Sequence, residues 1–281
     1  MNSCGLLLAV TLCWTPPLAA QVPQDLARDR AEYAAWLRGA PTSPFAAVAL
    51  QRIGQGITLG PPGSDIVLSG IGQVHVAETG GRITLDSGSV SRSLPRNRAV
   101  PLGNYQVLAS GPAGRTNLLV FGTSHDVHPP EYFPYSRSAV DTVTLVPPAQ
   151  RQAVPLLAPE GTDVEAQEAG SVTVAQFGAP VSLRVRQLPG ASADEPELEI
   201  YFRDATSGHG SYPAGRFVGL EPVGGGRYRL DFNRARNPFC AYSSVYPCPA
   251  PWAGNTIGGR VEAGEKYRAA GAVEAGGAPG R

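Results

Sequence analysis

The sequence predicts a mainly β protein, in which two antiparallel β-sandwich or barrel-like halves pack together behind one N-terminal amphipathic helix. Three observations support this fold class. The 281 residues include 34 glycines and 27 prolines, and only 16% are charged, which is a turn-rich composition. Short apolar runs recur at roughly ten-residue intervals between turn residues. Polar and apolar residues alternate cleanly in several of these runs, as expected for strands with one wet and one buried face.

Residues 1–20 have the outline of a secretory leader. They hold no charged side chain, and an apolar run from Leu6 to Trp14 precedes a Pro-Pro break and small residues that end at Ala20. A Lys or Arg usually starts such a leader, and none is present here. The run is too short to span a bilayer. We therefore expect an exported protein, periplasmic or extracellular, that is cleaved after Ala20 and has no transmembrane segment.

Residues 21–43 predict the helix and a linker. Leu26, Tyr33, Trp36 and Leu37 recur at mixed three- and four-residue spacings with charges between them, and Gly39 ends the pattern. No other stretch of the sequence shows a persuasive amphipathic helix.

Residues 44–122 predict the first β half. Its segment ITLGPPGSDIVLSG, residues 57–70, resembles the opening of a forkhead-associated sandwich, in which such a strand precedes a phosphopeptide-reading loop. That loop carries a Ser-Arg pair and a His, but here His75 lies inside an expected strand and no Ser-Arg pair precedes it. We interpret His75 as a half-exposed strand residue and expect no phosphothreonine reading.

Residues 123–268 predict the second β half, whose expected strands end with GGRVEAGE at 258–265, and residues 269–281 predict a disordered tail. The joining loop holds His125, Asp126 and His128. Imidazole and carboxylate groups suit Zn or Fe. Two His and one Asp in a Pro-rich loop are more often solvated, however, so no metal site is predicted.

The charge balance excludes some partners. Lys and Arg total 23 and Asp and Glu total 23, which argues against a protein that mainly coats nucleic acid or an anionic membrane. No dinucleotide-binding or phosphate-binding loop is present, so no cofactor is predicted. The oligomeric state is left open.

Two cysteines, Cys240 and Cys248, remain after the leader. In an oxidising compartment an even pair at short spacing predicts a disulfide, worth roughly 2–3 kcal/mol on the chain-entropy description. Two alternatives stay open. A nucleophilic Cys240 would need a thiolate of low pKa and a nearby base, and a two-Cys metal site would need further ligands.

Three segments of the second half gather acids, amides and cations: residues 202–217, 230–251 and 261–267. The predicted catalytic residues are Asp204, Asp231 and Glu265. The predicted ligand-binding residues are Tyr212, Arg216, Asn233, Asn237 and Lys266. Strand alternation places Asp231 on one face with Arg229 and Asn233.

In this interpretation Asp231 or Glu265 is a general base, and Arg216 stabilises an anion through its fork of donors. A structural interpretation stands beside it. Asp and Asn before turns bond their own backbone, and Arg216 then forms a salt bridge with Asp204 or Asp231.

The motifs FRDATSGHGSYPAGRF, LDFNRARNPFCAYSSVYPCPAPWAGN and EAGEK resemble the signature of an uncharacterised prokaryotic family, domain of unknown function 1684. The resemblance extends to the helix end at Trp36-Leu37 and to LGPPGSDIVL, and so covers most of the chain after the leader. It implies that these residues occupy signature positions: Asp204, Thr206, Gly208, Tyr212, Gly215, Arg216, Asp231, Asn233, Asn237, Pro238, Cys240, Cys248, Pro249, Asn255, Glu265 and Lys266. It implies no reaction, substrate or cofactor.

The chain departs from that signature at a few positions. Phe239 and Trp252 stand where the pattern usually has Pro, and Thr256 stands where it commonly has Arg. The missing Arg weakens any role of Thr256 in anion binding. His209 falls at a variable position, which counts against a general catalytic role.

Two functions follow from the sequence. The first is a polar pocket in the second half that binds a small polar or anionic molecule; if the protein is an enzyme, hydrolysis is the simplest reaction class. The alternative is a non-catalytic β-rich binding or structural module of the cell envelope. They differ in whether the acids, amides and Arg216 surround one shared cavity.

Overall fold

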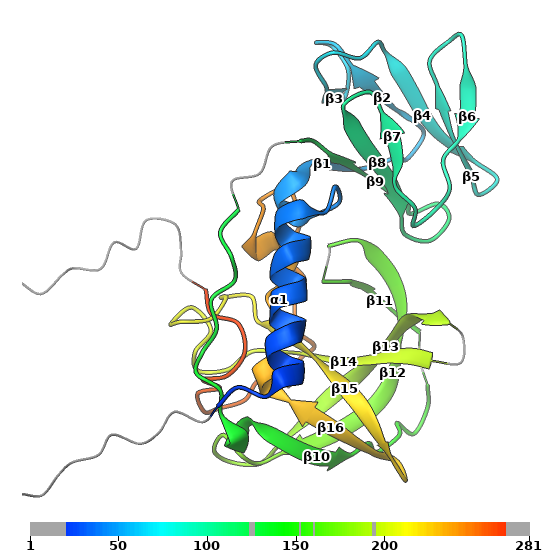
Figure 1. Ribbon diagram of the computed structural model, residues 1–281. Coiled ribbons are helices and arrows are strands. Elements are labelled where there is room, and N and C mark those ends of the chain that lie inside the picture. The colour runs from blue at the N-terminus through cyan, green and yellow to red at the C-terminus, as the bar shows by residue number, and fades with distance from the viewer. Residues whose placement is uncertain (1–20, 124–126, 152, 160, 193–194, 268–281) are drawn as a thin grey trace, which may run out of the picture.

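A computed structural model describes residues 21–123, 127–151, 153–159, 161–192 and 195–267. Within these ranges the chain forms one α-helix and sixteen strands in three sheets, which confirms the mainly β fold (Figure 1). The expected leader, the expected tail, His125 and Asp126 lie outside the described residues. No helix of the described part is long and apolar enough to cross a membrane.

The first β half is a small two-sheet module, residues 47–121. One sheet has the order β1-β9-β8-β7, and the other has the order β3-β2-β4-β5-β6. The strand bounds are β1 Ala47–Arg52, β2 Ile57–Gly60, β3 Ile66–Val67, β4 Val74–Thr79, β5 Arg82–Asp86, β6 Ser91–Ser93, β7 Val100–Leu102, β8 Tyr105–Ser110 and β9 Asn117–Phe121. Buried side chains of both sheets, such as Leu59, Val76, Val107 and Val120, share one apolar core. His75 lies in β4 and is exposed.

The second half is one seven-stranded antiparallel sheet in the order β10-β16-β15-β14-β13-β12-β11. The strand bounds are β10 Val140–Thr144, β11 Ala153–Leu157, β12 Asp163–Val174, β13 Val181–Ser192, β14 Glu195–Phe202, β15 Arg216–Gly224 and β16 Arg227–Asp231. The sheet curls on itself, because Val146 and Ser171 exchange backbone hydrogen bonds of 2.9 Å between the end of β10 and β12. The second half is therefore barrel-like.

The expected strand at 258–265 does not form; these residues are an irregular segment. Their carbonyl groups are bound by a side chain instead of a neighbouring strand, as described below for Arg216. The buried apolar residues Val261 and Ala263 still join the core of the large sheet.

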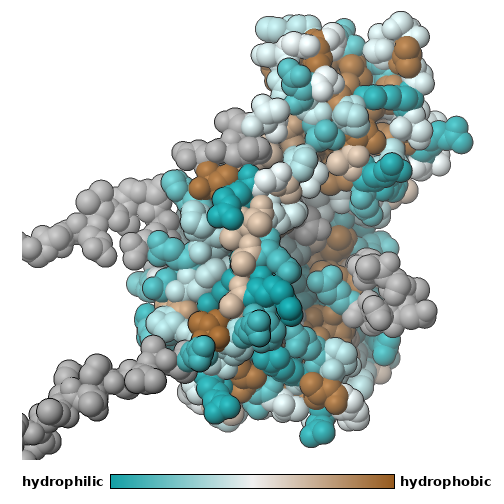
Figure 2. Space-filling view, in the orientation of Figure 1, coloured by the Kyte–Doolittle hydropathy of each residue, from teal (hydrophilic) through white to brown (hydrophobic). Residues whose placement is uncertain are grey.

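Helix α1, Gln24–Gly39, packs on the second half although the small module follows it in sequence (Figure 1). The Arg30 guanidinium donates to the carbonyl of Asn233 at 3.0 Å, and the Trp36 ring lies 5.8 Å from the Phe239 ring. Leu26 and Leu37 are the buried residues of α1, and in Figure 2 a pale-brown strip follows the helix with hydrophilic residues beside it. The helix thus forms one body with residues 128–267.

Candidate functional site

A buried arginine braces the C-terminal segment. Arg216 is 1% exposed, and its Nη2 donates to Asp204 Oδ2 at 3.1 Å and to the carbonyl of Val261 at 2.8 Å. Its Nη1 donates to the carbonyls of Ala263 and of Glu265. The guanidinium therefore donates only to groups inside the protein. It binds the carbonyls of residues 261–265, which a neighbouring strand would otherwise bind.

The Asp204 carboxylate also accepts hydrogen bonds from the turn that follows it in sequence. Its Oδ1 accepts from the Thr206 backbone N–H at 3.1 Å and from the Thr206 hydroxyl at 2.7 Å. Its Oδ2 accepts from the backbone N–H of Val261 at 2.7 Å. Such a carboxylate has no free lone pair for a ligand, so Asp204 and Arg216 act together as a structural brace.

Asp231 lies in a second local cluster. Its Oδ1 accepts from the backbone N–H of Asn233 at 3.0 Å, and its Oδ2 accepts from Arg229 at 3.0 Å, so the expected patch of these three residues does form. Asn233 in turn exchanges two hydrogen bonds of 2.9 Å with the backbone of Ser136. Neither Asp231 nor Asn233 lines a cavity described below. Their contacts fix the start of β10 against the end of β16.

Glu265 faces a cavity of about 560 Å³. The residue is 1% exposed, and its Oε2 accepts from the backbone N–H of Asn237 at 2.9 Å. Its Oε1 accepts from the Tyr242 hydroxyl, which also accepts from the Tyr33 hydroxyl at 3.3 Å. Burial raises the pKa of Glu265 to about 7, although the hydrogen bonds from Tyr242 and Asn237 and the charge of Arg236 oppose that rise. This carboxyl group is poised to gain or lose a proton near neutral pH.

Aromatic rings and one ammonium group complete this cavity, which we call the Glu265 cavity. Phe45, Tyr242 and Tyr267 line it, together with Lys266. The Lys266 ammonium lies 5.3 Å from the centre of the Phe133 ring and makes no ion pair with any described residue. The cavity thus offers a proton-exchanging acid and a cation beside aromatic rings, and His128 and Glu131 line it as well.

Asn237 stands between the Glu265 cavity and a neighbouring cavity under α1. It is 4% exposed and lines both, and its Nδ2 donates to the carbonyl of Lys266 at 3.0 Å. Its Oδ1 has no hydrogen-bond partner within the described chain. A buried acceptor without a partner is costly unless a donor reaches it, so Asn237 marks a place for a donor group.

Cys240 and Cys248 form the expected disulfide, with Cα atoms 5.5 Å apart. The Tyr212 hydroxyl donates to the carbonyl of Cys240 at 3.0 Å and lies 3.3 Å from the sulfur of Cys248. Tyr212 therefore ties the turn at 204–215 to the disulfide loop, which also carries Tyr242. Among the described residues no group of three or more His, Cys, Asp or Glu could hold a metal ion.

The comparisons with known proteins place these features in a family. The family described as "Protein of unknown function (DUF1684)" matches residues 128–266. We call residues 128–266 the DUF1684 segment. A solution NMR structure of an uncharacterized protein from gene locus rrnAC0354 of Haloarcula marismortui is 29% identical, covers 50% of this chain and 77% of its own, and has a TM-score of 0.43. No curated protein matches the chain.

The DUF1684 segment holds all eight predicted catalytic and ligand-binding residues, but the structure divides them. Glu265, Asn237 and Lys266 line the Glu265 cavity. Asp204, Arg216 and Tyr212 belong to the brace and the disulfide loop, and Asp231 and Asn233 form their own cluster.

Sequence reasoning missed the two tyrosines that contact Glu265 directly or through a hydroxyl. Tyr242 lies inside the long family motif, between the two cysteines, and that position was the available signal. Tyr33 lies outside the DUF1684 segment, on α1, and contacts Tyr242 across 209 positions of sequence. No local pattern indicates such a contact.

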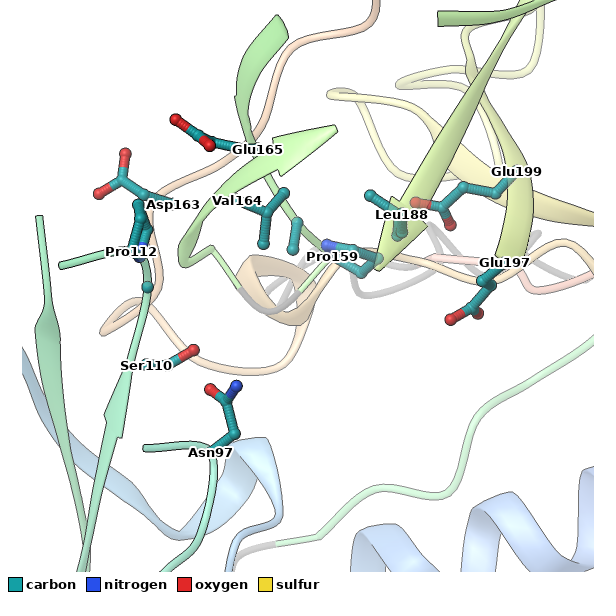
Figure 3. A pocket seen from close by; sticks show the side chains of 12 residues that line it. Asn97, Ser110, Pro112, Pro159, Asp163, Val164, Glu165, Leu188, Glu197 and Glu199 are labelled. Carbon is teal, nitrogen blue, oxygen red and sulfur yellow. The ribbon is translucent and has the colours of Figure 1, made fainter. Parts of the chain in front are cut away.

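A further cavity of about 440 Å³ lies where the small module meets the large sheet (Figure 3). Asn97 and Ser110 of the module face β12 and β14 of the DUF1684 segment across it. Ion pairs fix this junction, because Arg52 pairs with Asp163 and Arg115 pairs with Glu165.

Proposed function

We propose that the Glu265 cavity binds a small polar molecule with an anionic group and that Glu265 exchanges a proton with it near neutral pH. One observation carries the proposal. A carboxyl group that is 1% exposed, with its pKa raised to about 7 by burial, faces a cavity of about 560 Å³. Perturbed acids of this kind are enriched at functional sites, and a pKa near the working pH suits acid–base exchange.

Lys266 gives the ligand its charge preference. Its ammonium lacks a carboxylate partner among the described residues, so a carboxylate or phosphate group would supply one. The rings of Phe45, Tyr242 and Tyr267 would cover the apolar part of the ligand, as is common in small-molecule sites.

Hydrolysis is the reaction class that these residues support best. In its ionised form Glu265 would accept a proton from a water molecule as that water attacks a carbonyl carbon or phosphorus of the ligand, and Lys266 would stabilise the developing negative charge. The protonated Glu265 would then return this proton to the leaving group as the bond between that group and the attacked atom breaks. The Tyr242 hydroxyl and the Asn237 N–H would hold the carboxylate in place during the transfer.

A thermal-shift screen of sugar phosphates and small carboxylates tests this proposal. A ligand that binds only the native state raises the melting temperature by mass action. We expect hits that are lost in Lys266→Met and retained in Glu262→Gln, which removes an exposed acid whose partner is Arg260. Turnover of a hydrolysed hit should fall by about 10²–10⁴-fold in Glu265→Gln. Equal shifts in Lys266→Met and in the wild type would contradict the proposal.

The alternative, a non-catalytic envelope module, is favoured by two observations. Asp204 and Arg216 form their hydrogen bonds within the protein, and the Cys240–Cys248 disulfide constrains the loop next to them. In that case no small molecule should shift the melting temperature, while reduction of the disulfide should lower it strongly.

We also propose that the protein is exported and cleaved after Ala20. The disulfide supports this, because such bonds persist in oxidising compartments. The intact mass of the protein recovered from its native host tests it: a chain that still contains residues 1–20 would contradict it.

A further inference from the structure

Two cavities beside the large sheet adjoin each other, because they share lining residues. The cavity at the module junction, about 440 Å³, and the cavity under α1, about 570 Å³, share Pro159, Glu197 and Glu199. We call the two together the acidic groove. It begins between the small module and β12 and ends beside α1.

The junction half of the groove has acids at both ends and an apolar middle. In Figure 3, Asp163 and Glu165 lie at one end and Glu197 lies at the other. Val164, Pro159 and Leu188 lie between them. Alternating acidic and apolar surface of this kind matches a linear molecule that carries positive charges joined by methylene groups.

Of the four acids that line the junction cavity, Asp163 pairs with Arg52, Glu165 with Arg115 and Glu199 with Arg186, so Glu197 contributes the uncompensated charge. Glu197 makes no side-chain hydrogen bond or ion pair with another described residue, and it lines both cavities. Asp163 accepts from Arg52 and from Asn117 through Oδ2 alone. A carboxylate has about four lone-pair sites, so even the paired acids can accept further donors.

The half under α1 adds aromatic rings and an unpartnered acceptor. Trp36 and Phe239 line it, as does Asn237, whose Oδ1 lacks a donor and which is 4% exposed. Ammonium groups are attracted to the faces of aromatic rings and donate to amide oxygens.

Two arginines of this half do not oppose a cation strongly, because acids of α1 neutralise them. Arg236 donates to Asp29 at 2.8 Å, and Arg234 pairs with Asp25 and lies 3.5 Å from Asp29.

We propose that the acidic groove binds a linear polyamine. One ammonium group binds at Asp163 and Glu165, the next binds at Glu197, and the chain between them covers the apolar middle. A longer polyamine continues under α1, where its terminal ammonium group donates to Asn237 Oδ1 beside the Trp36 ring. Among lining residues this site shares only Asn237 with the Glu265 cavity, and it does not depend on the proposed reaction there.

Calorimetric titration of the full-length protein with spermidine tests the proposal. We expect saturable binding that is weakened about five-fold in Glu197→Gln, as for one exposed ion pair, and unchanged in the matched surface variant Glu262→Gln. Hexylamine, with one charge, should bind more weakly than spermidine, and added salt should weaken spermidine binding. Lys266→Met, which alters the Glu265 cavity, should leave spermidine binding unchanged.

Two outcomes would overturn the proposal. One is the absence of saturable spermidine binding up to about 10 mM, which corresponds to a negligible affinity. The other is equal spermidine affinity in Glu197→Gln and Glu262→Gln. That result would show that spermidine binds the acidic surface nonspecifically.

Discussion

At the scale of single residues, Glu265 and Arg216 show how burial sorts charged side chains into different roles. Both are 1% exposed, and the backbone of Glu265 is bound by the Arg216 guanidinium. Arg216 finds an acid and several carbonyl groups inside the protein. The Glu265 carboxyl accepts from a backbone N–H and a tyrosine hydroxyl, has no guanidinium at ion-pair distance among the described residues, and faces a cavity. One therefore serves as a brace, and the other remains able to titrate.

The first prediction concerns the pH dependence of stability. The pKa of Glu265 is about 7 in the folded protein against an ordinary value of 4.5, so the folded state binds more protons between these pH values. The free energy of unfolding should therefore fall as the pH rises from about 4.5 to about 7, and it should then level off. The total loss is on the order of 3 kcal/mol.

Glu265→Gln removes this titration, because Gln resembles the protonated acid at every pH. Urea unfolding between acidic and mildly alkaline pH should show a flatter profile for the variant than for the wild type. Parallel profiles would show that Glu265 titrates at an ordinary value.

The second prediction concerns the brace. Arg216→Met leaves Asp204 buried without its cation and several carbonyls without a donor, and should cost about 3–5 kcal/mol of unfolding free energy. The control is Arg260→Met, which breaks an exposed pair with Glu262 and should cost about 1 kcal/mol or less. Chemical denaturation measures both, and equal losses would contradict the buried brace.

The residues of the Glu265 cavity were only partly predictable from sequence. Glu265, Asn237 and Lys266 stand in polar motifs and were identified from them. Whether Asp204 would bind a ligand or a neighbouring arginine depended on burial, and two residues of opposite charge in one segment are compatible with either. The contact between Tyr33 and Tyr242 depended on the placement of α1, which is a tertiary fact.

At the scale of elements, the disulfide loop connects the turn of the brace to the Glu265 cavity. Tyr212 contacts the loop at Cys240, and Tyr242 extends from the loop to Glu265. Because eight positions separate the two cysteines, the bond limits how far Tyr242 can move. The loop therefore holds one wall of the cavity in place.

The third prediction follows from that loop. Replacing both cysteines by Ala should lower the free energy of unfolding by about 2–3 kcal/mol, since the unfolded chain regains the freedom of a short loop. Reduction of the wild type should lower its melting temperature to that of the variant. If reduction changes the variant as much as the wild type, the effect does not come from this bond.

The positions of the strands were more predictable from the sequence than the way the strands pair. The alternating runs at 181–186 and 227–232 become β13 and β16, because alternation with one buried face is a local property. The run at 258–265 has similar composition but remains irregular, because the Arg216 side chain binds its carbonyl groups. Local pattern cannot reveal a competing partner that lies some 45 positions away.

At the scale of the whole molecule, the described residues form two large apolar cores and a smaller cluster in which Leu119 and Phe121 of the small module pack with Tyr246 of the disulfide loop. The small module encloses its own apolar core between two sheets. The large sheet has a core of its own, and α1 packs on this body with Leu26 and Leu37 buried and with its acids paired to Arg234 and Arg236. The small module is thus inserted between two parts of a single larger body.

The fourth prediction tests this division. A fragment of residues 41–123 should fold alone and give well-dispersed amide resonances, because its main core lies between its own two sheets. A fragment of residues 127–267 should be markedly less stable than one in which a short Gly-Ser linker joins residues 21–40 to it. Equal melting temperatures of the latter two would show that α1 adds nothing to the body.

The position of α1 also sets an order of events while the chain is being made. The helix emerges early, but Asn233 and Tyr242, which it contacts, follow 203 and 209 positions after their partners Arg30 and Tyr33. Until those residues are synthesised, α1 remains undocked and its apolar side chains stay accessible. The small module, whose contacts are more local in sequence, can fold during this time. A nascent chain halted before Asn233 would therefore present a finished domain beside an undocked helix, which is the kind of surface that chaperones bind.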